Sequence, residues 1–212
     1  MINIKKFVFN PFQVNTYVLW DETKECIIID AACYEDFEKS ELIDFIKTNG
    51  LNPVMQINTH CHIDHVLGNN AIFENFKILP TIHKAGEIFY SSAHKQALNY
   101  GFKADELYET DKFCVEGDII KFGNSTLEIL YTPGHADGSI CLVSKDQKFV
   151  IVGDVLFHDS IGRTDFPTGN HNLLINNIKN KLFTLGDDFT VYTGHGPETN
   201  IGYERVNNPY LS

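Results

Sequence analysis

The chain has 212 residues, of which 43% are hydrophobic, so its composition allows a substantial buried core and excludes a disordered chain. It carries 17 basic and 28 acidic residues, a formal net charge of −11, without any run of Lys or Arg. We therefore expect neither a nucleic-acid partner nor an anionic membrane surface. The five cysteines form no Cys-x-x-Cys pair, which indicates neither a disulfide framework nor a thiolate zinc site. Asn10 and Pro11 interrupt the apolar N-terminus and no membrane-length apolar run follows, so we expect a cytoplasmic protein.

The first 58 residues predict four strands and one helix. Strand-forming residues occupy 2–9, 15–20 and 26–30, and the third run is continuously apolar until it ends at Asp30. Residues 34–49 carry apolar side chains at helical spacing, closed by Asn49 and Gly50, and residues 53–58 form the fourth predicted strand. Asp30 is either a cap of the following turn or a carboxylate that supports a ligand histidine.

The fourth predicted strand leads into an unusual motif, Thr59-His60-Cys61-His62-Ile63-Asp64-His65. If residues 60–64 are extended, the side chains of His60, His62 and Asp64 point to one side, because side chains alternate along an extended chain. His65 joins them only if the chain turns. Asp64 is a good N-cap residue, and apolar spacing over 65–76 predicts that a helix begins there. Cys61 faces the other way, so we expect it to be a small buried hydrophobe.

Imidazole and carboxylate groups together suit zinc, iron or manganese. Four such groups in six residues exceed what one tetrahedral catalytic ion takes from a single loop, which indicates two divalent ions. The alternative is a histidine-rich surface loop with no bound ion.

Residues 78–82 predict another strand, and the segment 83–113 has helical tendency over 85–98 with several aromatic residues. This segment is either a lid or pocket wall, or a helix that packs its aromatic rings on the core. His83 and His94 lie here and belong to no ligand-spaced cluster, so we expect neither to bind a metal.

The second half is rich in strands, predicted at 118–122, 125–131, 139–144, 148–152 and 189–194, with a helix at 170–185. A strand ends just before a potential ligand at His60, His135, Asp154 and His195. Side chains at strand ends are held by a rigid scaffold and remain accessible. His158 and His171 do not follow such strands, and of these two we consider only His171 a substrate-contact candidate.

The alternation of strand blocks with helices predicts an α/β fold of two sheets covered by helices. No linker rich in Pro, Gly or Ser interrupts the chain, so we expect residues 1–212 to form one domain.

The motif, together with His135, Asp154 and His195 in this order, resembles the metallo-β-lactamase fold superfamily. That resemblance implies a four-layer αβ/βα sandwich of two mixed β-sheets flanked by helices. The Gly-Arg-Thr-Asp-Phe stretch at 162–166 and the segment Gly-His-Gly-Pro-Glu-Thr at 194–199 resemble the glyoxalase II-like, or hydroxyacylglutathione hydrolase-like, enzymes. Glyoxalase II proper has a helical C-terminal extension for glutathione recognition, whereas 17 residues follow His195 here, so the chain looks closest to the short, single-domain members.

The resemblance also implies a ligand assignment. His60, His62 and His135 would hold one ion, Asp64, His65 and His195 the other, and Asp154 would bridge them. Zinc is the expected metal, with iron or manganese as alternatives.

The expected reaction is hydrolysis of a thioester, such as an S-acylglutathione or another thiol conjugate, by a hydroxide that the two ions share. A thiol leaving group, with a reference pKa near ~8.5, departs with little acid catalysis. Asp64 and Asp154 would orient the hydroxide. Arg163 or Lys84 would hold a substrate carboxylate, unless Arg163 instead forms an ion pair with an acidic neighbour.

Three other functions remain open or are less favoured. Persulfide dioxygenases resemble this chain too, and would use one iron held by His60, His135 and Asp154. A secreted β-lactamase is disfavoured because no signal peptide is expected and because an aspartate stands where that group usually places a cysteine. A metal-binding module without catalysis is disfavoured because structural sites are normally closed.

Overall fold

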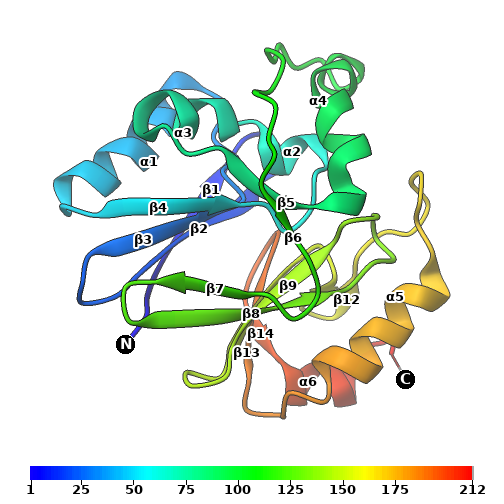
Figure 1. Ribbon diagram of the computed structural model, residues 1–212. Coiled ribbons are helices and arrows are strands. Elements are labelled where there is room, and N and C mark those ends of the chain that lie inside the picture. The colour runs from blue at the N-terminus through cyan, green and yellow to red at the C-terminus, as the bar shows by residue number, and fades with distance from the viewer. Residues whose placement is uncertain (212) are drawn as a thin grey trace.

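The computed structural model describes residues 1–211 and has four layers, two facing sheets between two layers of helices (Figure 1). The expected αβ/βα architecture is therefore confirmed. The first sheet contains, in spatial order, β1 (Asn3–Phe9), β2 (Val14–Trp20), β3 (Glu25–Ile29), β4 (Asn52–Ile57), β5 (Pro80–His83) and β6 (Phe113–Cys114). Strands β1 to β3 pair antiparallel, and β3 to β6 pair parallel, so the sheet is mixed.

The second sheet has the spatial order β14 (Thr199–Asn200), β13 (Thr190–Thr193), β10 (Phe149–Gly153), β9 (Ile140–Ser144), β8 (Ser125–Tyr131) and β7 (Ile119–Phe122). Strands β10 and β13 pair parallel, so their carboxyl ends lie at the same edge. A separate small hairpin joins β11 (Leu156–Phe157) to β12 (Ser160–Ile161).

Helices cover the outer face of each sheet (Figure 1). Helices α1 (Asp36–Thr48) and α3 (Asn69–Phe76) lie over the first sheet. Over the second sheet lie α5 (His171–Asn177), continued by a π-helical turn (Ile178–Leu182), and α6 (Ile201–Asn207). The short α2 (Ile63–Val66), a 3₁₀ turn (Lys84–Gly86) and α4 (Glu87–Asn99) lie at one end of the sheets. No helix within residues 1–211 is both long enough and apolar enough to cross a lipid bilayer.

The continuous isoleucine run of β3 shows why the sheets lie inside the molecule. Ile27 and Ile29 belong to the core cluster between the two sheets, whereas Ile28 belongs to the cluster under α1 and α3. All three side chains are fully buried, as expected for a strand covered on both faces.

The strand predictions for the first sheet are confirmed to within one or two residues, but the helix predicted over 65–76 is wrong. It is two helices: α2 begins at Ile63 with His62 as its N-cap residue, and α3 begins at Asn69. Asp64 is therefore in the first turn of α2 and is not the N-cap. Gly68 explains the break, because its backbone N–H donates to the carbonyl of Ala31 at 2.8 Å instead of to a helical acceptor.

Two other predicted segments also differ in detail. The predicted helix over 85–98 is a 3₁₀ turn followed by α4, and the predicted helix over 170–185 changes to a π-helical turn after Asn177. Cys61 is buried in an apolar cluster, as expected, and burial raises the pKa of its thiol.

Candidate metal centre

The predicted ligands lie on four segments, each of which follows a strand, and the first of these segments continues into α2 with Asp64 and His65. The His60 motif follows β4, His135 follows β8, Asp154 follows β10 and His195 follows β13. The loops after β10 and β13 are joined directly, because the Gly194 N–H donates to the Gly153 carbonyl at 2.7 Å. Ligand side chains from both sheets therefore converge on one place.

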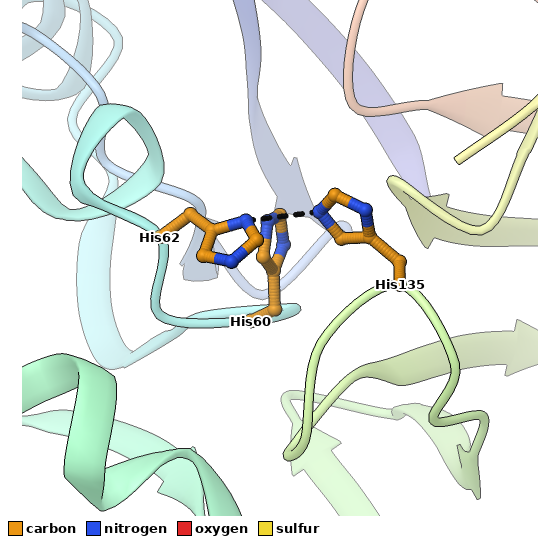
Figure 2. Close-up of side chains that lie close together, drawn as sticks. All are labelled: His60, His62 and His135. Atoms are coloured by element: carbon orange, nitrogen blue, oxygen red, sulfur yellow. Dashed lines mark hydrogen bonds between the residues drawn. The ribbon is translucent and has the colours of Figure 1, made fainter. Parts of the chain in front are cut away.

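Three overlapping groups of side chains have potential ligand atoms within 4.8 Å of one another. The imidazoles of the first group point toward one another from two separate loops (Figure 2), and His62 Nδ1 lies 2.9 Å from His135 Nε2. The groups are His60, His62 and His135; His60, His65 and Asp154; and Asp64, His65 and His195.

The Asp154 carboxylate lies between the group of His60, His62 and His135 and the group of Asp64, His65 and His195. One of its oxygens is 3.4 Å from His65 Nε2, and the other is 3.4 Å from His195 Nε2 and 3.8 Å from His135 Nε2. Asp64 lies on the side of the second group, with Oδ2 3.4 Å from His195 Nε2 and 3.8 Å from His65 Nε2.

The histidine rings are oriented by acceptors on the far side from the cluster. Nδ1 of His135 lies 2.8 Å from the Arg163 carbonyl, and Nδ1 of His195 lies 2.9 Å from the Phe12 carbonyl. A carbonyl only accepts, so in both rings Nδ1 carries the hydrogen. In the neutral ring, the lone pair of Nε2 then faces the cluster, which is the state that a metal ligand requires.

Asp30 performs the same task for His60 and His65. Its Oδ2 lies 3.0 Å from His65 Nδ1 and accepts from the Thr59 hydroxyl at 2.6 Å. Because that hydroxyl donates to Asp30, it is an acceptor for His60 Nδ1, 3.3 Å away. Asp30 thus contacts one candidate ligand directly and a second through Thr59.

Buried atoms without a protein partner test whether cations fit this site. Nε2 of His60 is buried without a hydrogen-bond partner, and the buried atoms His65 Nε2 and Asp154 Oδ1 have no partner besides each other, 3.4 Å apart. Buried polar atoms are nearly always paired, because an unpaired one costs about 1–3 kcal/mol. All three atoms lie in one ligand group, and each offers a lone pair to a divalent cation once its ring is neutral, so the residues fit bound cations.

The charges of the site divide its histidines into two kinds. Burial and the neighbouring imidazoles lower the pKa of His60 well below its usual value, and burial and His135 lower that of His62 to about 4. Burial opposes charge on His65, but the carboxylates of Asp154, Asp64 and Asp30 outweigh it and raise its pKa well above its usual value. For His195, Asp154 and Asp64 likewise outweigh burial and raise the pKa to about 10. The carboxylates therefore favour positive charge at His65 and His195, and bound divalent cations would supply positive charge at the same place.

The cluster opens into a pocket of about 1220 Å³. Helix α4, the loop of Phe12 and the β11–β12 hairpin contribute to its wall. The sequence left open whether the segment 83–113 forms a pocket wall or packs its aromatic rings on the core. Helix α4 does both, because Phe89 lines the pocket and also belongs to an apolar core cluster.

The proposed substrate contacts differ in position. Arg163 lines the pocket, but its guanidinium pairs with both carboxylate oxygens of Asp165, at 2.9 and 2.7 Å, and lies over the Phe166 ring. Lys84 lies outside the pocket wall, paired with Glu87 at 2.6 Å. His171, the exposed first residue of α5, is also outside it. Neither Lys84 nor His171 therefore has a place in the cavity.

The remaining histidines lie apart from the cluster. His83 stacks on Tyr131, and His94 lies 3.5 Å from a Glu106 oxygen. His158 lines the pocket, which its sequence position did not predict, and is grouped with Asp159 and Glu204. The buried Glu204 carboxylate already accepts hydrogen bonds from Thr199, Asn208 and the Asp159 N–H, so this group is a structural network.

Sequence reasoning missed the backbone acceptors and the aromatic wall. The carbonyls of Phe12 and Arg163 leave no signal in the side-chain pattern, because any residue supplies a carbonyl. The only available signal for Phe166 was its place in the Gly-Arg-Thr-Asp-Phe stretch.

Known proteins resemble this chain over nearly its whole length. The family model of the metallo-beta-lactamase superfamily matches residues 9–195. Hydroxyacylglutathione hydrolase GloC of Haemophilus influenzae is 35% identical over 213 residues, which cover 100% of this chain and 99% of that protein. The crystal structure of the BLEG-1 B3 metallo-beta-lactamase is similar with a TM-score of 0.90 and 32% identity, covering 99% of this chain and 100% of that one. A di-iron-bound structure of TTHA1623 has a TM-score of 0.87 and 28% identity, covering 98% and 100% of the two chains.

Proposed function

This chain belongs to the metallo-beta-lactamase superfamily, and from that premise we propose that it is a dinuclear metal-dependent hydrolase that cleaves a thioester, such as an S-acylglutathione. Membership of a family of metallo-hydrolases supports an enzyme that uses divalent metal ions. The likeness to a hydroxyacylglutathione hydrolase supports a thiol conjugate of low molecular mass, rather than a macromolecule, as substrate.

The single observation that carries the proposal is that buried ligand atoms of His60, His65 and Asp154 converge, with no hydrogen-bond partner outside this group. In the proposed assignment His60, His62 and His135 hold one ion, and Asp64, His65 and His195 hold the other. Asp154 is shared, which agrees with its position between the two groups. An all-imidazole and carboxylate set suits zinc, and it also suits iron or manganese.

Two ions in such a site lower the pKa of a water molecule toward neutrality and polarise a carbonyl. Side chains of the protein orient the water and hold the substrate. Asp64 and Asp154 accept hydrogen bonds from the attacking water and orient it, since carboxylate oxygens are acceptors. The pocket walls hold the thioester carbonyl against the centre, and Phe89 and Phe166, packed at His62, keep other water away from it.

Replacement of the shared carboxylate tests the dinuclear site. We expect Asp154→Ala to lower the metal content of the purified protein and to reduce kcat for a thioester at least about 10³-fold, because both ions lose a ligand. Metal content would be measured by plasma emission spectrometry, and hydrolysis by loss of the thioester absorbance. The control is Asp188→Ala, which removes an exposed carboxylate that pairs with Lys148. Full turnover by the Asp154 variant would refute the dinuclear mechanism.

Two further assays on the same preparation distinguish the other reactions of this superfamily. Oxygen uptake with glutathione persulfide would indicate a dioxygenase with one iron held by His60, His135 and Asp154. Cleavage of a chromogenic β-lactam would indicate the activity named for BLEG-1. The proposal predicts that kcat/KM for the thioester exceeds kcat/KM for the persulfide and for the β-lactam. A larger value for the persulfide or the β-lactam would refute thioester hydrolysis as the main activity.

A further inference from the structure

Aromatic rings surround the candidate metal centre at contact distance. The Phe89 and Phe166 rings lie edge-on to the His62 imidazole, with ring centres 5.1 and 5.6 Å apart, and the Phe157 ring lies 6.2 Å from that of His195. A substrate whose carbonyl carbon is at this centre therefore has apolar surface within reach of its acyl group.

The wall of the same pocket carries further large apolar side chains. Three of its large apolar side chains are unusually exposed: Phe12 at 40%, Ile88 at 66% and Tyr100 at 51%. The rings of Phe12 and Tyr100 contact each other edge-on, 5.7 Å between centres, so they form one surface rather than scattered residues. A contiguous exposed apolar surface that is continuous with a catalytic pocket indicates a binding site for an apolar group.

Three polar side chains beside this wall already have partners. Ser92 Oγ donates to the Ile88 carbonyl at 2.7 Å, and Gln96 Nε2 donates to Ser92 Oγ at 2.8 Å. The Arg163 guanidinium is paired with Asp165. A hydrocarbon acyl group would displace none of these contacts.

We propose that the acyl group of the substrate is bulky and apolar, either aromatic or branched aliphatic, and packs on the wall of Phe12, Ile88, Phe89 and Tyr100. This inference rests on the proposed thioester hydrolysis. In that reaction the oxygen of one water bonds to the acyl carbon, and the C–S bond breaks with its electron pair on sulfur. One proton of the water ends on the thiol, so the products are an apolar carboxylic acid and a free thiol.

The test compares three glutathione thioesters: propionyl, 3-phenylpropionyl and lactoyl. The first two have the same substitution next to the carbonyl, so their intrinsic reactivity is matched, and the third adds only a hydroxyl to the first. We expect kcat/KM for 3-phenylpropionyl to exceed that for each of the others by at least about tenfold, as apolar pockets discriminate by 10–200-fold per small group. Rates would be corrected for spontaneous hydrolysis.

Two substitutions on the same helix locate the effect. Ile88 and Leu98 are both on α4 and similarly exposed, at 66% and 64%, but only Ile88 lines the pocket. We expect Ile88→Ser to lower the preference for 3-phenylpropionyl over propionyl at least about threefold, mainly through KM. Leu98→Ser should leave it unchanged. Metal content and thermal unfolding of both variants would be measured to exclude misfolding.

The outcomes separate this inference from the proposed function. Hydrolysis of all three thioesters at equal kcat/KM, or best hydrolysis of the lactoyl thioester, would overturn the apolar acyl group and leave the hydrolase intact. An equal effect of Ile88→Ser and Leu98→Ser on the preference for 3-phenylpropionyl would show that the acyl group does not pack on Ile88. No hydrolysis of any of the three by metal-replete protein would overturn the proposed function itself, and this inference with it.

Discussion

At the scale of single residues, the candidate centre depends on acceptors that orient its imidazoles. Asp30 is the most connected of these, because it accepts from the Thr59 N–H at 2.7 Å, from the Thr59 hydroxyl at 2.6 Å and contacts His65 Nδ1 at 3.0 Å. Its backbone is left-handed, with φ of 51°, a conformation that Asp and Asn tolerate better than most residues. One carboxylate thus supports two candidate ligands, His65 directly and His60 through Thr59.

We expect Asp30→Asn to weaken metal binding by about 10- to 100-fold, the usual effect of losing an outer partner of a ligand. Asparagine fits the same backbone and volume, but its NH₂ group must face an N–H or O–H donor. That conflict drives His65 toward the tautomer with hydrogen on Nε2. Competition titration with a chromophoric chelator measures the affinity. Thr59→Ser retains the hydroxyl and serves as control, and unchanged affinity in the Asp30 variant would contradict this role.

At the scale of elements, Asp21 at the end of β2 connects the turns of the two sheets. Its carboxylate accepts from the Thr23 N–H in the β2–β3 turn, from the Asn124 N–H in the β7–β8 turn at 2.7 Å and from the hydroxyl of Ser125, the first residue of β8, at 2.8 Å. Burial opposes its ionisation, but these hydrogen bonds outweigh it and lower the pKa of Asp21 to about 2. The hairpins of the two sheets are therefore joined by one charged group.

This contact predicts a specific pH dependence of stability. The pKa of an aspartate in the unfolded chain is about 3.9. The folded pKa is lower, so the stabilisation is fully present above about pH 4 and is lost as pH falls through about 2. Asp21→Asn should thus lower the free energy of unfolding by about 1–3 kcal/mol at pH 7, and the difference from wild type should shrink toward pH 2. Urea unfolding at several pH values measures it. Asp44→Asn, an exposed position on α1, is the control, and a difference independent of pH would contradict the assignment.

At the scale of the whole molecule, the candidate centre joins the two sheets. The motif that contains His60 and His65 follows a strand of the first sheet, whereas His135, Asp154 and His195 follow strands of the second. Ions held by both sets would connect the two halves of the sandwich. Because the unfolded chain does not hold these side chains together, bound ions would stabilise the folded state.

We expect removal of metal to lower the unfolding temperature of the entire chain. An ion present at 100 times its dissociation constant stabilises by about 2.7 kcal/mol, which corresponds to about 5–10 °C for a chain of this size. Differential scanning calorimetry with and without a chelator measures the shift, and restoration of zinc should reverse it. The Asp154→Ala variant should lose most of the shift. Equal unfolding temperatures of metal-loaded and chelated wild type would show that the ions do not join the sheets.

The sequence by itself determined the features that depend on neighbouring residues. The longer strands, the ligand motif and the placement of His135, Asp154 and His195 at strand ends follow from local periodicity and residue type, and the family resemblance follows from the motifs. The two-residue strands β6, β11, β12 and β14 were not predicted. Only the tertiary structure decided which distant groups meet. It placed the Phe12 and Arg163 carbonyls behind His195 and His135, paired Arg163 with Asp165, and left Lys84 and His171 outside the cavity. It also divided the predicted helix at Gly68, where the chain packs so closely that a side-chain carbon would lie 2.4 Å from Cys33 Sγ. Except for the local Arg163–Asp165 pair, these contacts join residues far apart in the chain, and their energies depend on packing that no local pattern encodes.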